Sequence, residues 1–192
     1  MKTDQMLKGI DCICFDLFGT LIEITDRRRP FASMLRRMPR QKVDRFRRLT
    51  MTTGLSLAEI NEEIEGGATI AHLLEAQFAI AREVISARLR PGVLAALREL
   101  PIPYGICSNL SPEYMLVLKQ FADLEPKFRV LSCQVGCMKP DPAIYALVAD
   151  ASGLTPDRIM FVGDTTSADI DGPRRAGMKA VPIDDFLAEL AE

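Results

Sequence analysis

The sequence has no tryptophan, one histidine and only five cysteines among its 192 residues. No two cysteines form a CxxC pair, which argues against a disulfide framework or a structural zinc site and predicts a reducing, cytoplasmic location. The single histidine, His72, lies within a predicted helix, so we expect no catalytic pair of histidine with cysteine or carboxylate. No apolar run approaches the roughly 20 residues of a membrane-spanning helix, and residues 1–10 lack the apolar stretch of a secretory signal. We therefore expect no membrane contact.

The net charge is −2, which argues against general nucleic-acid binding. The charge is uneven, because residues 27–48 hold ten basic side chains and a single acidic one, Asp44. Such a segment is either a solvated helical face or a surface that binds an anion. Few aromatic residues lie among these side chains, so stacking on single-stranded nucleic acid is not indicated. We expect a small anionic substrate, and the sequence leaves the oligomeric state open.

Short apolar runs alternate with helical patterns through most of the chain. The runs are typical of buried strands and cover residues 10–18, 104–107, 129–135, 158–162 and 179–183. Helical patterns cover residues 92–100, 112–121, 142–152 and 168–176, and two of them open with a capping residue followed by proline. This alternation predicts an α/β fold, with a mostly parallel sheet covered by helices on both faces.

Residues 22–90 interrupt the alternation. They show helical patterns over residues 31–38, 41–49, 56–65 and 69–89, with no convincing strand after Ile24. Ser56 and Glu59 have the spacing of a capping box at the start of the third helix. We therefore predict two domains: an α/β core made of residues 1–21 and 91–192, and an all-helical insert made of residues 22–90.

Reactive side chains follow four of the predicted strands. Because the carboxyl ends of parallel strands meet at one edge of a sheet, these side chains are expected to converge. Clustered carboxylates repel one another unless a cation lies among them, and oxygen ligands of this kind suit Mg²⁺. The residues concerned are Asp16, Ser108, Asn109, Lys139, Asp164 and Asp169.

This set of groups supports covalent catalysis. Asp16 is the expected nucleophile, which forms an aspartyl intermediate that water then hydrolyses. Ser108, nearby backbone N–H groups and Lys139 would stabilise the anionic transition state. Asp16, Asp164 and the Phe18 carbonyl are the expected ligands of Mg²⁺.

The stretches FDLFGTL, CSNLSPE, MKPDPAIY and VGDTTSADIDGPRRAGM, in this order, resemble the four motifs of the haloacid dehalogenase-like hydrolase superfamily. The resemblance implies a Rossmann-like three-layer core with a helical cap inserted after the first motif, which corresponds to residues 22–90. It also implies that Asp16 is the nucleophile, Ser108 a phosphate or substrate ligand and Lys139 the charge-balancing base. Asp164 would be a metal ligand, supported by Asp169.

One position departs from the pattern of the superfamily's phosphatases. These enzymes usually carry a second aspartate two residues after the nucleophile, where it protonates the leaving oxygen and later activates water, and this chain has Phe18 there. Haloacid dehalogenases have an aromatic residue at this position. However, they usually have Ser or Asn in place of Gly163-Asp164, and they bind no Mg²⁺. The first two motifs therefore favour a dehalogenase, and the fourth motif favours a phosphatase.

Three functions remain open on this basis. A Mg²⁺-dependent phosphatase that acts on a small phosphorylated metabolite is favoured, because Asp164 and Asp169 are present. The alternatives are a metal-independent 2-haloacid dehalogenase and a catalytically impaired member that serves in binding or regulation. In dehalogenases a cap arginine binds the leaving halide, and the resemblance makes Arg47 the candidate for that role. Asn109 is a further candidate for substrate binding.

Overall fold

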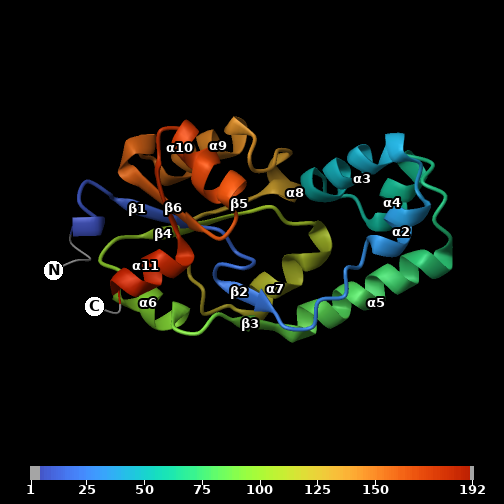
Figure 1. Cartoon of the computed structure of the whole chain (residues 1–192), viewed down its shortest axis with the longest axis horizontal. Helices are drawn as coiled ribbons and strands as arrows, with labels where there is room; N and C mark the ends of the chain where they lie inside the picture. The colour runs from blue at the N-terminus through green and yellow to red at the C-terminus, as the bar shows by residue number, and fades with distance from the viewer. Residues whose placement is uncertain (1–4, 191–192) are drawn as a thin grey trace.

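The computed structural model describes residues 5–190 and has a five-stranded parallel sheet at its centre. The strands lie in the order β5-β4-β1-β6-β7 (Figure 1), and all four pairings between neighbours are parallel. Their bounds are β1 (Cys12–Phe15), β4 (Tyr104–Ser108), β5 (Arg129–Leu131), β6 (Ile159–Gly163) and β7 (Lys179–Pro182). The predicted α/β fold with a mostly parallel sheet is thus confirmed.

Strand β1 lies in the middle of the sheet and is buried along its whole length. Successive side chains of a strand point to opposite faces. Ile13 and Phe15 accordingly join one apolar core, while Cys14 joins the other. Phe15 is level with Ile106 of β4 and with Val162 of β6. The residue that follows Phe15, Asp16, therefore emerges at the centre of the carboxyl edge of the sheet.

Helices cover both faces of the sheet and produce the predicted three layers (Figure 1). One face is covered by α9 (Pro142–Ser152) and α10 (Gly172–Arg175), and the other by α6 (Val93–Glu99), α7 (Met115–Gln120) and α11 (Ile183–Leu190). Shorter elements are η1 (Pro112–Tyr114), α8 (Ser132–Val135), η2 (Pro156–Arg158) and η3 (Thr166–Asp171). Asp141 caps α9 as expected, because its Oδ1 accepts a hydrogen bond of 2.9 Å from the backbone N–H of Ala143.

Residues 22–90 form four helices with a short antiparallel ribbon at the two ends of the segment. The helices are α2 (Ala32–Arg37), α3 (Arg40–Thr52), α4 (Leu57–Glu63) and α5 (Ile70–Ser86), and the predicted capping box of Ser56 and Glu59 is present at α4. The ribbon pairs β2 (Ile22–Ile24) with β3 (Ala87–Leu89). The sequence pattern extended the last helix to residue 89. Strand β3 was not predicted, because its pairing partner β2 lies more than 60 residues away in the sequence. Local periodicity carries no information about such a distant partner.

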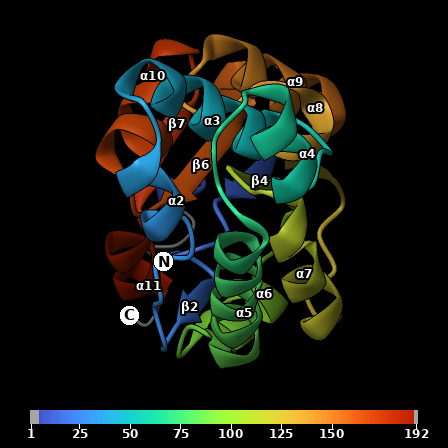
Figure 2. The same ribbon diagram turned by 90° about the vertical axis from the view of Figure 1, so that its right-hand side faces the viewer.

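The four helices lie beyond the carboxyl edge of the sheet (Figures 1 and 2). Seen from that end, α3 and α4 stand in front of the strands, and α5 runs below them toward the ribbon (Figure 2). Contacts between α3 and α8, and between α5 and η1, join this segment to the sheet-bearing part of the chain. Within residues 5–190, every helix is too short or too polar to cross a membrane.

Candidate active site

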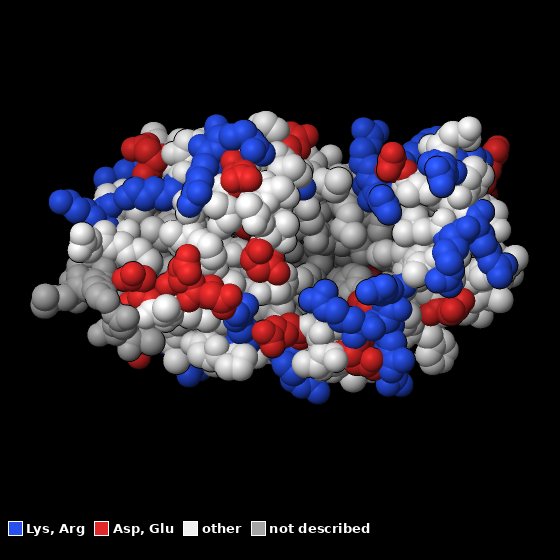
Figure 3. All heavy atoms as spheres, viewed as in Figure 1, with Lys and Arg blue, Asp and Glu red and all other residues white. Residues whose placement is uncertain are grey.

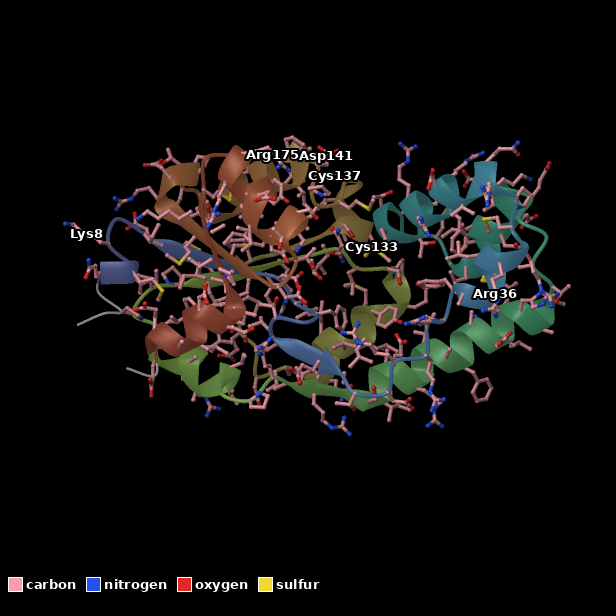
Figure 4. The ribbon with its side chains drawn as sticks, viewed as in Figure 1. Lys8, Arg36, Cys133, Cys137, Asp141 and Arg175 are labelled. Carbon is pink, nitrogen blue, oxygen red and sulfur yellow. The ribbon has the colours of Figure 1, made fainter. Side chains whose placement is uncertain are left out.

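The centre of the site is a buried ammonium shared by two carboxylates. Lys139 Nζ lies 2.7 Å from Asp16 Oδ1 and 2.6 Å from Asp169 Oδ1. The exposed fraction is 9% for the side chain of Asp16 and 2% for those of Lys139 and Asp169. Figure 4 labels Cys137 and Asp141, which flank the turn that carries Lys139 between α8 and α9. Three segments that are distant in sequence thus meet at the carboxyl end of β1.

Burial and charge act in opposite directions on these groups. Burial raises the pKa of Asp16 above its ordinary value, and the positive charge of Lys139 counteracts part of that shift. Burial alone would lower the pKa of Lys139, but the charges of Asp16 and Asp169 outweigh it and raise this pKa. Lys139 is therefore held in its charged form.

Asp164 brings a third carboxylate to the same place. One oxygen atom from each of Asp16, Asp164 and Asp169 can be chosen so that all three lie within 4.8 Å of one another. Asp164 is exposed, whereas the other two are buried. With all three ionised and Lys139 charged, the cluster has a net charge of −2, which a divalent cation would balance. Three carboxylates with an open, solvent-facing side are a donor set that suits Mg²⁺.

Two glycines let these acidic side chains approach the backbone. A Cβ atom on Gly19 would lie 2.0 Å from Asp164 Oδ2, and the φ angle of Gly19 is +88°. A Cβ atom on Gly163 would lie 2.4 Å from the Cβ of Asp169. The loop after Asp16 therefore lies directly against Asp164, and β6 ends directly against Asp169. Asp169 is fixed further by the backbone N–H of Thr165, which donates to its Oδ2 at 3.0 Å.

Thr20, which the sequence pattern allowed either as a cap of the turn after Gly19 or as a site residue, contacts the Asp16 carboxylate. Its Oγ1 lies 3.2 Å from Asp16 Oδ2, to which it donates a hydrogen bond, and its side chain is fully buried. Each oxygen of Asp16 thus has a partner: Lys139 on one side and Thr20 on the other. The available signal was a hydroxyl four residues after the carboxylate, across a turn that contains Gly19.

Ser108 and Asn109 lie at the carboxyl end of β4 as expected, but their side chains lie in different environments. Ser108 is the last residue of β4 and is almost fully buried. Asn109 binds the backbone of Lys139 at both polar ends: Nδ2 donates to the carbonyl of Lys139 at 2.9 Å, and Oδ1 accepts from its N–H at 2.8 Å. The amide of Asn109 therefore holds the Lys139 turn in place, instead of pointing freely toward a substrate.

The structure does not bring Arg47 into this cluster. Arg47 lies on α3 with its side chain 63% exposed, and its nearest acidic partner is Asp44 at 3.9 Å. Its neighbour Arg48 lines a groove together with Met138 and Pro140, which are the residues before and after Lys139 in the sequence. The role predicted for Arg47 stays a prediction, and Arg48 is the arginine that shares a groove with the turn around Lys139.

The basic side chains predicted over residues 27–48 gather around one side of the molecule. Figure 3 shows lysine and arginine side chains over α2–α5, at the margin of a hollow between this segment and the sheet-bearing part. Arg36, labelled in Figure 4, lies on α2. Several of the basic groups are paired with acids, as in Arg45 with Glu63 and Arg28 with Asp26. The surface is thus positive but partly neutralised.

An apolar pocket of about 190 Å³ opens beside the loop that follows Asp16. It lies between β2, α3 and η1 and is lined by Phe18, Ile24, Pro30, Phe31, Met51, Asn109, Leu110, Ser111 and Tyr114. Phe18 contacts Tyr114 edge to face, with the ring centroids 5.7 Å apart. Phe18 and Asn109 connect the pocket to the catalytic cluster, since one follows Asp16 by two residues and the other holds Lys139.

Curated relatives of this chain are phosphatases. The N-acetylmuramic acid 6-phosphate phosphatase of Pseudomonas aeruginosa is 30% identical over 95 residues, which cover 48% of this chain and 42% of that protein. The phosphoserine phosphatase of Thermus thermophilus is 38% identical over 96 residues, which cover 49% and 39%. The chain thus aligns with less than half the length of these relatives.

Solved structures share the fold at lower identity. A HAD family enzyme of Bacteroides thetaiotaomicron, in complex with magnesium and inorganic phosphate, has a TM-score of 0.64 at 19% identity, covering 91% of this chain and 94% of that one. A 2-haloacid dehalogenase of Pseudomonas syringae has a TM-score of 0.55 at 19% identity, covering 89% and 85%. Residues 10–177 match the family described as haloacid dehalogenase-like hydrolase. The chain belongs to the haloacid dehalogenase-like hydrolase family.

Proposed function

We propose that this chain is a Mg²⁺-dependent phosphatase that acts on a small phosphorylated molecule through an aspartyl-phosphate at Asp16. The observation that carries the proposal is the cluster of Asp16, Asp164 and Asp169 around Lys139. Such a cluster provides a nucleophile, a fixed cation and a set of oxygen ligands at one place. The names of the curated relatives support phosphate ester hydrolysis.

The metal would be held by Asp16, Asp164 and the Phe18 carbonyl, with Asp169 in support. A bound Mg²⁺ would offset the charge between the carboxylate nucleophile and the phosphate, and would polarise the phosphorus–oxygen bonds. The net charge of −2 in the cluster and the exposure of Asp164 fit this assignment. The solved Bacteroides enzyme was crystallised with magnesium and phosphate, which supports the choice of ion.

The chemistry has two displacement steps at phosphorus. In the first, a carboxylate oxygen of Asp16 bonds to phosphorus while the ester oxygen departs with the bonding electron pair. In the second, water attacks the same phosphorus, the bond to Asp16 breaks, and inorganic phosphate leaves with the protons of that water. Lys139 and the Ser108 hydroxyl would stabilise the negative charge that develops, while Thr20 and Asn109 hold Asp16 and Lys139 in position.

We further propose that residues 1–21 and 91–192 act as the catalytic core and that the 22–90 segment acts as a cap. The position of α2–α5 beyond the carboxyl edge of the sheet supports this division (Figure 2). The basic surface of the segment would attract an anionic substrate, with Arg47 and Arg48 as candidate contacts. All five cysteines are unpaired, which supports a cytoplasmic location.

One specific observation favours a second candidate, a metal-independent 2-haloacid dehalogenase. Phe18 offers no proton to a leaving oxygen, and halide departure needs none. The phosphatase remains the better-supported function, because a metal-independent dehalogenase needs no metal ligand at Asp164. A catalytically impaired binding protein is the third reading.

The test is a paired assay on the purified full chain. Inorganic phosphate released from a panel of phosphate esters, and chloride released from 2-chloropropionate, are measured with Mg²⁺ and with EDTA. Phosphate release that EDTA abolishes supports the proposal, whereas EDTA-resistant chloride release replaces it with the second candidate. Asp16→Asn should abolish activity, and Asp171→Asn, at an exposed position near Asp169, is the matched control. Release of neither product across the panel would leave the impaired reading.

A further inference from the structure

The pocket beside the nucleophile contains no group placed to protonate a leaving oxygen. Of its nine described lining residues, Tyr114 is the one with an ionisable side chain. The Tyr114 hydroxyl donates its hydrogen bond to Glu83 Oε2, on the cap helix α5. Glu83 Oε1 also accepts from the backbone N–H groups of Arg28 at 2.6 Å and Arg29 at 3.0 Å. The phenolic proton is therefore committed to a buried carboxylate and directed away from the pocket.

The groups behind the nucleophile do not fill this role either. Lys139 is bound by Asp16 and Asp169 and is held charged between them. Lys139 is not among the residues that line the pocket, and its ammonium donates to the two carboxylates. A leaving group that departs into the pocket is therefore not protonated and leaves as an anion. The activation barrier for cleavage of the phosphorus–oxygen bond then depends directly on how basic that anion is.

The shape and lining of the pocket indicate what that anion looks like. Its volume of about 190 Å³ exceeds the roughly 150 Å³ of an apolar cavity that is known to hold benzene. The walls include the rings of Phe18, Phe31 and Tyr114 and the flexible side chain of Met51. Aromatic edges and thioether sulfur both pack favourably against another ring. One buried lining group, Ser111 Oγ, has no hydrogen-bond partner among the described residues and could bind a polar substituent of the ring.

We infer that the phosphatase site selects aryl phosphates, in which a phenolate ring occupies this pocket and leaves without protonation. The inference rests on the proposed function and names its substrate class. The bond between phosphorus and the phenolic oxygen breaks, the oxygen retains the electron pair, and solvent protonates the phenolate after release. A phenolate is a far weaker base than an alkoxide, because a tyrosine-type phenol has a pKa of about 10, whereas a simple alcohol is a much weaker acid.

The test measures kcat/KM for a series of substituted phenyl phosphates, for a simple alkyl phosphate and for acetyl phosphate. For the wild-type chain, kcat/KM should fall steeply as the leaving phenol becomes more basic, and the alkyl phosphate should be slower than phenyl phosphate by at least ~10²-fold, the contribution that a general acid would make. A flat dependence, or a preference for the alkyl phosphate, would overturn the inference. Acetyl phosphate has an even less basic leaving group but no ring, so it should fall below the line that relates kcat/KM of the aryl phosphates to leaving-group basicity. A value on that line would overturn the assignment of the ring to the pocket.

Two variants of Phe18 separate proton donation from packing. Phe18→Asp supplies the missing donor and should flatten the dependence on leaving-group basicity, raising alkyl phosphate hydrolysis relative to phenyl phosphate by ~10²-fold or more. Phe18→Leu removes the ring without adding a donor and should keep the steep dependence. Equal slopes for the two variants would contradict the inference. If Phe18→Asp fails to fold, the slope of the wild type and of Phe18→Leu still decides the question.

A further variant tests the pocket itself. Met51→Trp fills part of the cavity and should lower the ratio of kcat/KM for phenyl phosphate over acetyl phosphate about tenfold, the effect of ~1.4 kcal/mol of lost packing. An unchanged ratio would place the ring elsewhere.

The proposed phosphatase function can fail independently of this inference. It requires phosphate release from at least one substrate of the panel, whatever the dependence of kcat/KM on leaving-group basicity.

Discussion

Lys139 Nζ lies 2.7 Å from Asp16 Oδ1 although 123 residues separate the two in the sequence, and the same ammonium lies 2.6 Å from Asp169 Oδ1. A single buried cation thus holds together two carboxylates that would otherwise repel each other. The ion pair orients the Asp16 carboxylate, the proposed nucleophile, and balances part of its charge. Both the assembly of the site and its chemistry therefore depend on Lys139.

Replacing Lys139 by Met should destabilise the fold as well as abolish activity. It leaves Asp16 and Asp169 buried and facing each other, so we expect the free energy of unfolding in urea to fall by about 3–5 kcal/mol at neutral pH. The deficit should shrink as the pH is lowered, because the freed carboxylates can then take up protons. Lys119→Met, at an exposed position, is the control and should change little. Equal stabilities of the two variants would contradict the role of Lys139.

Replacing Gly19 by Ala should weaken the metal site specifically. The new Cβ would meet Asp164 Oδ2 at 2.0 Å, and the φ of +88° adds backbone strain of about 1–2 kcal/mol. Gly153→Ala is the matched control, because Gly153 has a φ of +72° and no atom within 4 Å of the added Cβ. Both variants should lose similar stability, but only Gly19→Ala should raise the Mg²⁺ concentration needed for half-maximal phosphate release. If both variants needed the same Mg²⁺ concentration, the result would contradict a role of Asp164 as a metal ligand.

Replacing Asn109 by Ala should lower kcat with little effect on KM. The variant loses both hydrogen bonds to the backbone of Lys139, so the ammonium should be less well placed in the transition state, at a cost of about 10–100-fold in kcat. Steady-state kinetics with an aryl phosphate make the measurement. A large rise in KM with kcat preserved would instead identify Asn109 as a substrate contact, as the sequence motif suggested.

Replacing Asp16 by Asn should stabilise the metal-free protein at neutral pH. Burial raises the pKa of Asp16 above its ordinary value of 3.8, so its contribution to stability is present at low pH and is lost as the pH rises through the folded-state pKa. The neutral amide avoids that loss, while Lys139 keeps Asp169 as its partner. Thermal unfolding in EDTA should show the variant above the wild type at pH 7 and equal to it near pH 4. The opposite order at pH 7 would show that the ion pair with Lys139 dominates over burial.

The sequence predicted most of the fold because the relevant signals are local. Apolar runs of strand length, helix caps such as Asp141 and the break after Gly19 are all visible in short windows. Once the sheet is parallel, topology alone brings strand ends to one edge, so the meeting of Asp16 with Lys139 and Asp169 also followed from the pattern.

The features that escaped prediction depend on contacts between distant segments. Strand β3 pairs with β2, with Arg88 level with Glu23, and the helical pattern of the preceding residues masked it. The hydrogen bonds between Asn109 and the Lys139 backbone depend on how two loops pack against each other. The residue types in the two loops do not determine that packing. The position of Arg47 on the exposed side of α3 is of the same kind, because a run of arginines does not indicate which one faces the site.

The proposed mechanism requires a phosphoryl group on Asp16 during turnover, and rapid-quench mass spectrometry can detect it. The chain is mixed with Mg²⁺ and excess phenyl phosphate, quenched in acid within the first turnovers, and mapped by peptides, with borohydride reduction to fix the position of the acyl phosphate. The account predicts a phosphoryl group on Asp16 that disappears in Asp16→Asn and persists in the exposed-site control Asp171→Asn. Phosphate release with no label on Asp16, or with the label on another residue, would contradict it.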